Sequence, residues 1–166
     1  MRALTLTSHG SLDQLRVQDV PDPVLSSPDQ LRITMRAAAL NRLDLFVLQG
    51  LPGVALQFPH VMGGDGAGVV ESVGPAVTRF KPGDRVMINP GISCWNCEYC
   101  LAGEHSLCVS YRLLGEHVPG SIAEPLVLPD RTPAPLPDGR PWEHAAACPA
   151  APPPAWPRRA TRLPLR

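Results

Sequence analysis

The chain reads Ser93-Cys94-Trp95-Asn96-Cys97-Glu98-Tyr99-Cys100, and a fourth cysteine, Cys108, follows after seven more residues. Two-residue gaps let a tight turn direct successive thiolates at one point, and structural zinc sites take four such ligands at tetrahedral corners. Four cysteines leave no coordination position open for a substrate or a water molecule. We therefore expect Cys94, Cys97, Cys100 and Cys108 to hold a structural zinc ion in an exposed lobe.

Other interpretations of the cysteines fit less well. Iron–sulfur clusters use similar spacings, but ferredoxin-type runs usually place the fourth cysteine differently. A zinc ribbon that binds nucleic acid would want basic surroundings, whereas Glu98 and Glu104 flank these ligands. The fifth cysteine, Cys148, stands apart in an alanine-rich segment, and we interpret it as a small core residue.

Composition restricts the partners that the chain can have. Its 166 residues suffice for one domain with a single core. Up to Cys148 there are 11 basic and 15 acidic side chains, a balance of −4 that gives no reason to expect nucleic acid or an anionic membrane as a partner. The first residues lack the apolar region of a signal peptide, so we expect a cytoplasmic protein.

The apolar pattern indicates many short strands with Gly/Pro turns, which is typical of an all-β barrel or sandwich. Leu43, Phe46 and Val47 have helical spacing and precede Gly50, so a short helix is expected there. The glycines at 64, 66 and 68 lack the spacing of a phosphate-binding loop and are interpreted as barrel bends with close backbone approach. The expected strands are 2–6, 15–20, 31–39, 68–74, 85–88 and 122–128, and the expected helix is 41–49.

The last 18 residues, 149–166, differ from the rest because they hold six prolines, four arginines and no acid. One interpretation is a disordered basic tail. The alternative is a frameshift, since Pro, Ala and Arg all have GC-rich codons. Translating the other frames of the gene downstream of codon 148 would distinguish the two.

Up to about residue 148 the chain resembles the medium-chain dehydrogenase/reductase family, that is, the zinc alcohol dehydrogenases and their quinone-reductase relatives. The cysteine spacing matches that family's structural-zinc lobe. The other matching segments are Asn41-Arg42-Leu43-Asp44, Gly63-Gly64-Asp65-Gly66-Ala67-Gly68-Val69-Val70, Phe80-Lys81-Pro82-Gly83-Asp84-Arg85-Val86, and Leu136-Pro137-Asp138-Gly139 with Glu143-His144-Ala145-Ala146-Ala147.

This resemblance implies a mainly β fold with short helices, a GroES-like partly open β-barrel over residues 1–148 with a protruding zinc lobe at about 91–112. It also implies that NAD(P) binds on a separate Rossmann domain. We expect that domain to be absent from this chain, which has no room for it after Cys148.

Zinc-dependent members hold a second, catalytic zinc through Cys, His and a third ligand, and this chain departs from that pattern. Asn41 stands at the Cys position, Gly64 at the His position and Asp65 at the neighbouring Glu position, while Leu43 replaces a proton-relaying Ser or Thr. Because glycine offers no side-chain ligand, we expect no catalytic zinc. The pattern looks like the quinone-oxidoreductase-like branch, in which Asn41 lines the pocket.

Three residues are therefore the candidate catalytic groups. Asn41 could donate a hydrogen bond to the substrate oxygen or simply cap the following helix. Asp44 could orient neighbouring groups, but we interpret it as a solvated acid of the first helical turn. Asp65 is interpreted as a turn residue in a glycine-rich bend rather than an acid catalyst.

Two functions remain open at this stage. The first is the catalytic-domain fragment of an NAD(P)-dependent oxidoreductase, of alcohol dehydrogenase or quinone/enone reductase type. It would transfer hydride to a small carbonyl or unsaturated carbonyl compound, and it could form a homo-oligomer. The second is a non-enzymatic, zinc-stabilised β-barrel that serves as a binding or assembly module.

Overall fold

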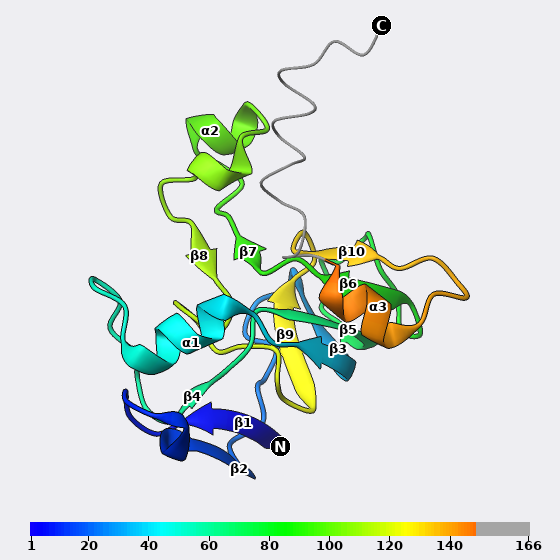
Figure 1. Ribbon diagram of the computed structural model, residues 1–166. Helices are drawn as coiled ribbons and strands as arrows, with labels where there is room; N and C mark the ends of the chain where they lie inside the picture. Colours follow the sequence, from blue (N-terminus) through cyan, green and yellow to red (C-terminus); the bar gives the residue numbers. More distant parts are fainter. Residues whose placement is uncertain (149–166) are drawn as a thin grey trace, which may run out of the picture.

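Two antiparallel sheets form the body of the protein in the computed structural model, which describes residues 1–148 (Figure 1). The predictions for 149–166 lie outside the described residues. One sheet has three strands in the order β2-β1-β4 and the other has five in the order β10-β6-β5-β3-β9. The strands are β1 (Arg2–Leu6), β2 (Leu15–Asp19), β3 (Gln30–Ala39), β4 (His60–Val61), β5 (Asp65–Val73), β6 (Arg85–Ile88), β9 (Pro125–Pro129) and β10 (Pro133–Pro135).

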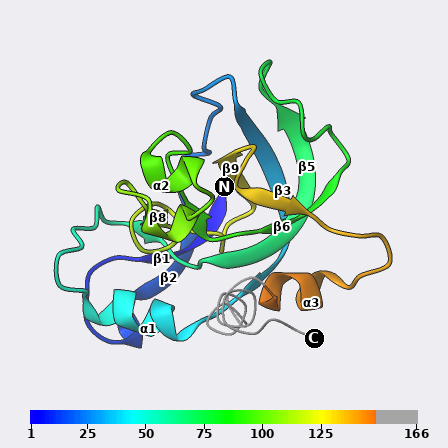
Figure 2. The ribbon, with the colours of Figure 1, turned by 90° about the horizontal axis from the view of Figure 1, so that it is seen from above.

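The two sheets are joined but do not close. Ala3 of β1 pairs with Ala123 in an isolated bridge, and the Leu4 N–H donates to the Ile122 carbonyl at 2.9 Å. Seen from above in Figure 2, strands β3, β5 and β6 curve together around the interior. The expected mainly β, partly open barrel with short helices is therefore confirmed.

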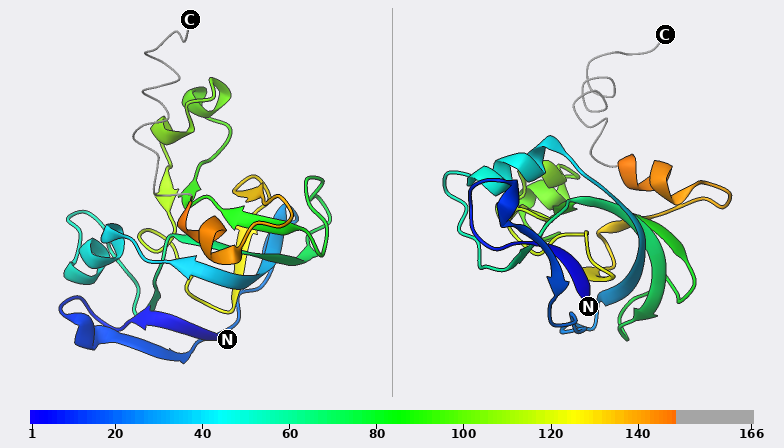
Figure 3. Two further views of the ribbon diagram at one scale, coloured as in Figure 1. Left: turned by 45° about the vertical axis from the view of Figure 1, so that its right-hand side comes forward. Right: turned by 60° about the horizontal axis from the view of Figure 1, so that its bottom comes forward.

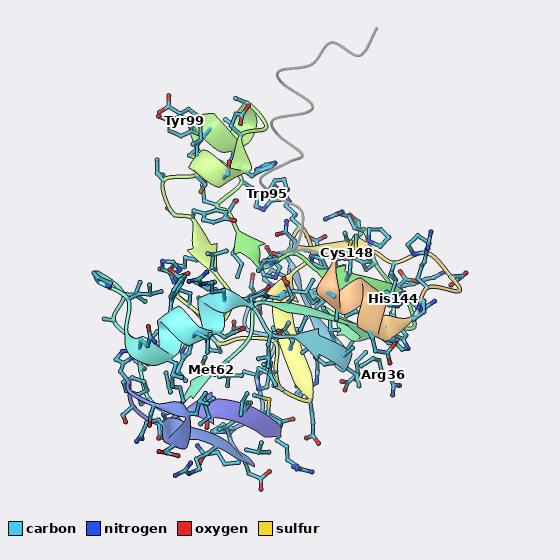
Figure 4. The ribbon with its side chains drawn as sticks, viewed as in Figure 1. Arg36, Met62, Trp95, Tyr99, His144 and Cys148 are labelled. Carbon is cyan, nitrogen blue, oxygen red and sulfur yellow. The ribbon has the colours of Figure 1, made fainter. Side chains whose placement is uncertain are left out.

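The main core lies on one face of the five-stranded sheet. The alternation predicted from 31 to 39 places Leu31 and Ile33 there, each with no exposed surface. They pack with Val70 of β5 and with Val86 and Ile88 of β6. The outer face of β3 carries polar residues instead, and Arg36 is labelled there in Figure 4.

The glycines of β5 permit a close approach of β3. A Cβ atom on Gly68 would collide with the Thr34 carbonyl oxygen and lie 2.7 Å from Ile33 Cγ2. Gly66 is crowded in the same way by the Met35 side chain. The predicted close backbone approach is confirmed at Gly68 but not at Gly64, where a Cβ atom would meet only ordinary contacts at 3.5 Å. Gly66 and Gly68 lie within a nine-residue strand rather than at a bend.

Two short helices cover the sheets (Figure 3). Helix α1 (Arg42–Gln49), close to the predicted 41–49, ends at Gly50, whose φ of 96° favours glycine. It buries Val47 and Leu48 in a second core with Leu6 and Met62. Helix α3 (Trp142–Ala147) packs its alanines 145 and 146 against Ala67 of β5.

Cys148 follows α3 and is exposed, so its interpretation as a core residue is wrong. Ala145 and Ala146 already occupy the face of α3 that packs on the sheet, and Cys148 comes after the helix has ended. Figure 4 labels Cys148 at the end of α3 and His144 on its surface. None of the helices in residues 1–148 has the length and apolarity needed to cross a membrane.

A lobe projects from the body between β6 and β9 (Figure 1). Its base is a two-stranded ribbon of β7 (Gly91–Ile92) and β8 (Arg112–Leu113). Helix α2 (Glu98–Leu101) and a 3-10 helix (His105–Leu107) form its tip. A further 3-10 helix (Leu12–Gln14) connects β1 and β2 in the body.

Candidate functional site

The four cysteines of the lobe converge as their spacing predicts. Their Sγ atoms all lie within 4.8 Å of one another, and the Sγ atoms of Cys94 and Cys100 are 4.0 Å apart. A tetrahedral zinc–thiolate site has sulfur–sulfur edges of roughly 3.8 Å, given Zn–S bonds of about 2.3 Å. Among residues 1–148 this is the one group of three or more His, Cys, Asp or Glu side chains arranged to hold a metal ion.

Backbone N–H groups favour the ionised form of two of these thiols, Cys97 and Cys108. The N–H groups of Cys94 and Ser110 donate to Cys108 Sγ at 3.2 and 3.4 Å, which lowers the pKa of Cys108. The N–H groups of Cys100 and Val109 lower the pKa of Cys97 to about 6.

Cys100 and Cys108 are the two buried ligands, each 6% exposed. Burial raises the pKa of the Cys100 thiol to about 12. A divalent ion would displace that proton, because thiolates and not thiols ligate zinc. The donor set therefore fits zinc.

An aromatic contact joins the lobe to the body. Trp95 adopts a left-handed φ of 61°, which turns the chain sharply between the first two cysteines. Its ring packs on His105 with centroids 4.0 Å apart, and the Arg131 guanidinium lies 5.6 Å from its centroid. Figure 4 shows Trp95 nearer the body and Tyr99 near the tip of the lobe.

A pocket of about 700 Å³ lies where the lobe meets the body. It brings together the three candidate catalytic residues and the other two departures from the zinc pattern, Leu43 and Gly64. The ribbon of the lobe also contributes to its wall. The lining residues are Asn41, Arg42, Leu43, Asp44, Gly64, Asp65, Met87, Asn89, Pro90, Tyr111, Leu113 and Ala134.

Asn41 is held in one orientation by its neighbours. It is the N-cap of α1, with extended φ and ψ of −124° and 163°, so the capping interpretation is confirmed. Its side-chain Nδ2 donates to Asp65 Oδ2 at 2.9 Å. One amide hydrogen is therefore committed to a carboxylate, and the other remains able to donate to a ligand.

The interpretation of Asp44 as solvated is wrong. Its side chain is 9% exposed, and its Oδ2 accepts from the Asn41 backbone N–H at 2.6 Å. Burial raises the pKa of Asp44, while the backbone N–H groups of Asn41 and Gly63 oppose that rise. The long-range contact with Gly63 gives no signal in the local sequence.

The interpretation of Asp65 as a turn residue is also wrong. It is the first residue of β5 and is 1% exposed. The Ser121 hydroxyl donates to its backbone carbonyl at 2.7 Å, and its carboxylate holds Asn41. Asn41 and Asp65 thus form a hydrogen-bonded polar pair that lines the pocket, where α1 and β5 begin.

Gly64 leaves space beside this pair. It is buried, yet a Cβ atom there would meet only ordinary contacts at 3.5 Å, with the Leu114 carbonyl oxygen and Pro90 Cβ. Position 64 therefore offers room for a side chain but supplies no ligand.

Tyr111 is a pocket residue that the sequence analysis missed. It is half-buried, and burial raises the pKa of its phenol. It comes three residues after Cys108, and no residue pattern marks it. Only the pairing of β7 with β8 carries it back to the pocket.

Known proteins share this architecture. The alcohol dehydrogenase GroES-like domain family matches residues 27–138. An alcohol dehydrogenase from Schizosaccharomyces pombe is 32% identical over 147 residues, which are 87% of this chain and 41% of that protein.

Two crystal structures superpose closely. One, of an NAD-dependent alcohol dehydrogenase, has 49% identity and a TM-score of 0.85 and covers 90% of this chain and 43% of its own. The other is a cobalt- and zinc-bound thermostable alcohol dehydrogenase from Pyrobaculum aerophilum, with 30% identity and a TM-score of 0.80, covering 90% of this chain and 44% of its own.

The chain spans about two fifths of the length of these relatives. The matched part includes the open sheets, the four-cysteine lobe and the pocket at the lobe's base. By sequence and by structure, this chain belongs to the alcohol dehydrogenase GroES-like domain family.

Proposed function

We propose that residues 1–148 are the substrate-binding domain of an NAD(P)-dependent oxidoreductase that transfers hydride to a small carbonyl or unsaturated carbonyl compound. The observation that carries this proposal is the pocket in which Asp65 fixes the amide of Asn41 at 2.9 Å. A pre-oriented donor in a partly water-excluding pocket stabilises charge that develops on a carbonyl oxygen.

The lobe holds the structural metal in this proposal. Cys94, Cys97, Cys100 and Cys108 would bind one zinc ion, which would cross-link the loop between β7 and β8. The five cysteines include no disulfide in the described structure, which suits a reducing compartment such as the cytoplasm.

We further propose that the pocket works without a second zinc ion. Gly64 has no side-chain ligand, and Asn41 is a poor one whose amide is engaged by Asp65. Charge on the substrate oxygen must then be met by hydrogen bonds, as in a quinone or enone reductase, instead of by a Lewis acid.

NAD(P)H would supply the hydride when bound. Within residues 1–148 the glycines at 64, 66 and 68 do not form a phosphate-binding loop, because 66 and 68 lie inside β5 and a strand, not a helix, follows. The residues of the pocket therefore bind and orient the substrate, and the nicotinamide must be held by other residues.

The test is a titration of the zinc-loaded chain with cyclohexanone, followed by two-dimensional NMR. We expect saturable shifts confined to the pocket, at Asn41, Gly64 and Leu113 among others. Shifts that are absent, or that scatter over the surface without saturating, would contradict the proposal. A parallel titration with NADH and NADPH asks whether the purified chain also binds the cofactor.

The second candidate is a non-enzymatic, zinc-stabilised binding or assembly module. The observation that favours it is the apolar surface of the lobe, where Leu101 and Val109 are 77% and 73% exposed and Tyr99 and Leu107 lie nearby in sequence. Another copy of the chain could cover that surface. Self-association in light scattering, without binding of ketone or cofactor, would favour this alternative.

A further inference from the structure

We propose that Tyr111 is a second hydrogen-bond donor, beside Asn41, that contacts the carbonyl oxygen of the substrate in this pocket, and that the lobe holds it there. This inference rests on the proposed function of the pocket. Of the twelve residues within 1–148 that line the pocket, Tyr111 is the one with a hydroxyl group. Leu43 also lines the pocket, at the position where the family that this chain resembles carries a Ser or Thr hydroxyl.

Within residues 1–148 no hydrogen bond engages the Tyr111 hydroxyl, whereas the amides of Asn41 and Asn89 each have a partner. Asn41 donates to Asp65 at 2.9 Å, and Asn89 Oδ1 accepts from the Gly91 N–H at 3.0 Å. A half-buried phenol without a protein partner is available to a ligand oxygen.

The backbone fixes the position of Tyr111. Its N–H donates to the Cys108 carbonyl at 3.0 Å, so the metal-binding turn holds one side of the residue. On the other side, β8 pairs with β7 in a register that sets Leu113 opposite Gly91. The metal-binding turn and the β7–β8 pairing therefore position Tyr111 in the wall of the pocket.

The ring packs closely over Gly91. A Cβ atom on Gly91 would collide with the Tyr111 hydroxyl and lie 2.9 Å from its Cζ. Glycine at this position is thus what allows the phenol to lie where it does. A side chain at position 91 would displace the ring without changing its chemistry.

A matched pair of ligands tests the hydrogen bond. Cyclohexanone has an acceptor oxygen, and methylenecyclohexane has nearly the same shape without one. For Tyr111→Phe we expect cyclohexanone affinity to fall about tenfold, the usual cost of losing one neutral hydrogen bond, and methylenecyclohexane affinity to stay unchanged. Tyr99→Phe, near the tip of the lobe in Figure 4, should change neither.

Gly91→Ala provides an independent variant, since it moves the ring but keeps the hydroxyl. We expect it to weaken cyclohexanone binding as Tyr111→Phe does, with zinc content and circular dichroism as checks of folding. If the wild-type chain binds neither ligand, the proposed function itself is overturned. If the wild type binds cyclohexanone and Tyr111→Phe binds it equally well, the pocket stands and the role of Tyr111 is overturned.

Discussion

Asp44 is a buried carboxylate that is held by backbone N–H groups. Its hydrogen bond to the Asn41 N–H starts helix α1, while burial raises its pKa above the ordinary 3.8. Because the folded-state pKa is raised, the folded chain binds more protons than the unfolded chain in the window above 3.8. The ionised carboxylate is therefore less favourable in the folded chain than in the unfolded chain. The free energy of unfolding falls as the pH rises from 3.8 through the folded-state pKa.

Asp44→Asn should remove this dependence. The amide oxygen can still accept from the Asn41 N–H, but it does not titrate. We expect the wild type to lose stability relative to the variant as the pH rises from about 4, as measured by urea unfolding at each pH. Asp13→Asn, at an exposed site in the first 3-10 helix, is the control and should follow the wild type. A constant difference between wild type and Asp44→Asn across this range would contradict the assignment.

Gly64 has no side chain that could bind a metal ion, but the position accepts a Cβ atom. A Cβ atom fits there with contacts at 3.5 Å, and Asp65 lies next to Asn41. The double variant Asn41→Cys with Gly64→His should therefore create a sulfur, nitrogen and oxygen ligand set with Asp65. We expect elemental analysis to give one zinc per wild-type chain and a second equivalent in the double variant.

Each single variant is the control for this construction, and each should retain one equivalent of zinc. Loss of the Asn41 cap is expected to cost about 1 kcal/mol of stability, which unfolding experiments would detect. A second zinc in the wild type would refute the proposed metal-free pocket. A double variant that folds but binds only one equivalent would refute the geometry of the ligand set.

At the scale of elements, the contact between β3 and β5 depends on Gly68. A methyl group there would collide with the Thr34 carbonyl oxygen, a backbone atom that cannot move away as a side chain can. We expect Gly68→Ala to destabilise the chain by about 2 kcal/mol or more, measured by chemical unfolding. Gly64→Ala adds the same atom where it meets only ordinary contacts at 3.5 Å, and it should be near neutral. Equal stabilities of the two variants would contradict this account.

Strands with clear alternation could be predicted from the sequence, and short ones could not. The pattern around Leu31 and Ile33 specifies β3, and Asn41 and Gly50 bound α1. Strands β4, β7 and β8 have two residues each, so no periodicity exists to detect. Strand β10 begins and ends with proline, which argues against a strand in sequence but is tolerated at a sheet edge.

The metal ligands were predictable because all four lie within one short segment and their chemistry is specific. The pocket was less predictable from the sequence than the metal ligands. Its polar pair joins Asn41 to Asp65 across 24 residues, and burial of those groups follows from packing that no local pattern encodes. Tyr111 was missed for the same reason, since its place depends on the ribbon's pairing with Gly91.

For the molecule as a whole, the lobe should depend on its metal while the body does not. The lobe has two-residue strands and exposed Leu101 and Val109, whereas the body contains the cores around Leu31 and Leu6. We expect Cys100→Ser to abolish zinc binding and cyclohexanone binding but to leave most far-ultraviolet circular dichroism intact.

Cys148→Ser is the matched control, because Cys148 lies outside the metal site. It should keep both zinc and cyclohexanone binding. Global unfolding of Cys100→Ser would show that the body also depends on the metal. Full cyclohexanone binding by a metal-free variant would show that the lobe and the pocket are not coupled as proposed.

The exposed thiol of Cys148 gives the protein a single chemical handle. Of the five cysteines, four would be masked by zinc, so a maleimide dye should attach once to the loaded chain and several times after chelation. The number of dyes attached, read by mass spectrometry, would report metal occupancy in one step. A dye placed there would also lie directly after the end of α3.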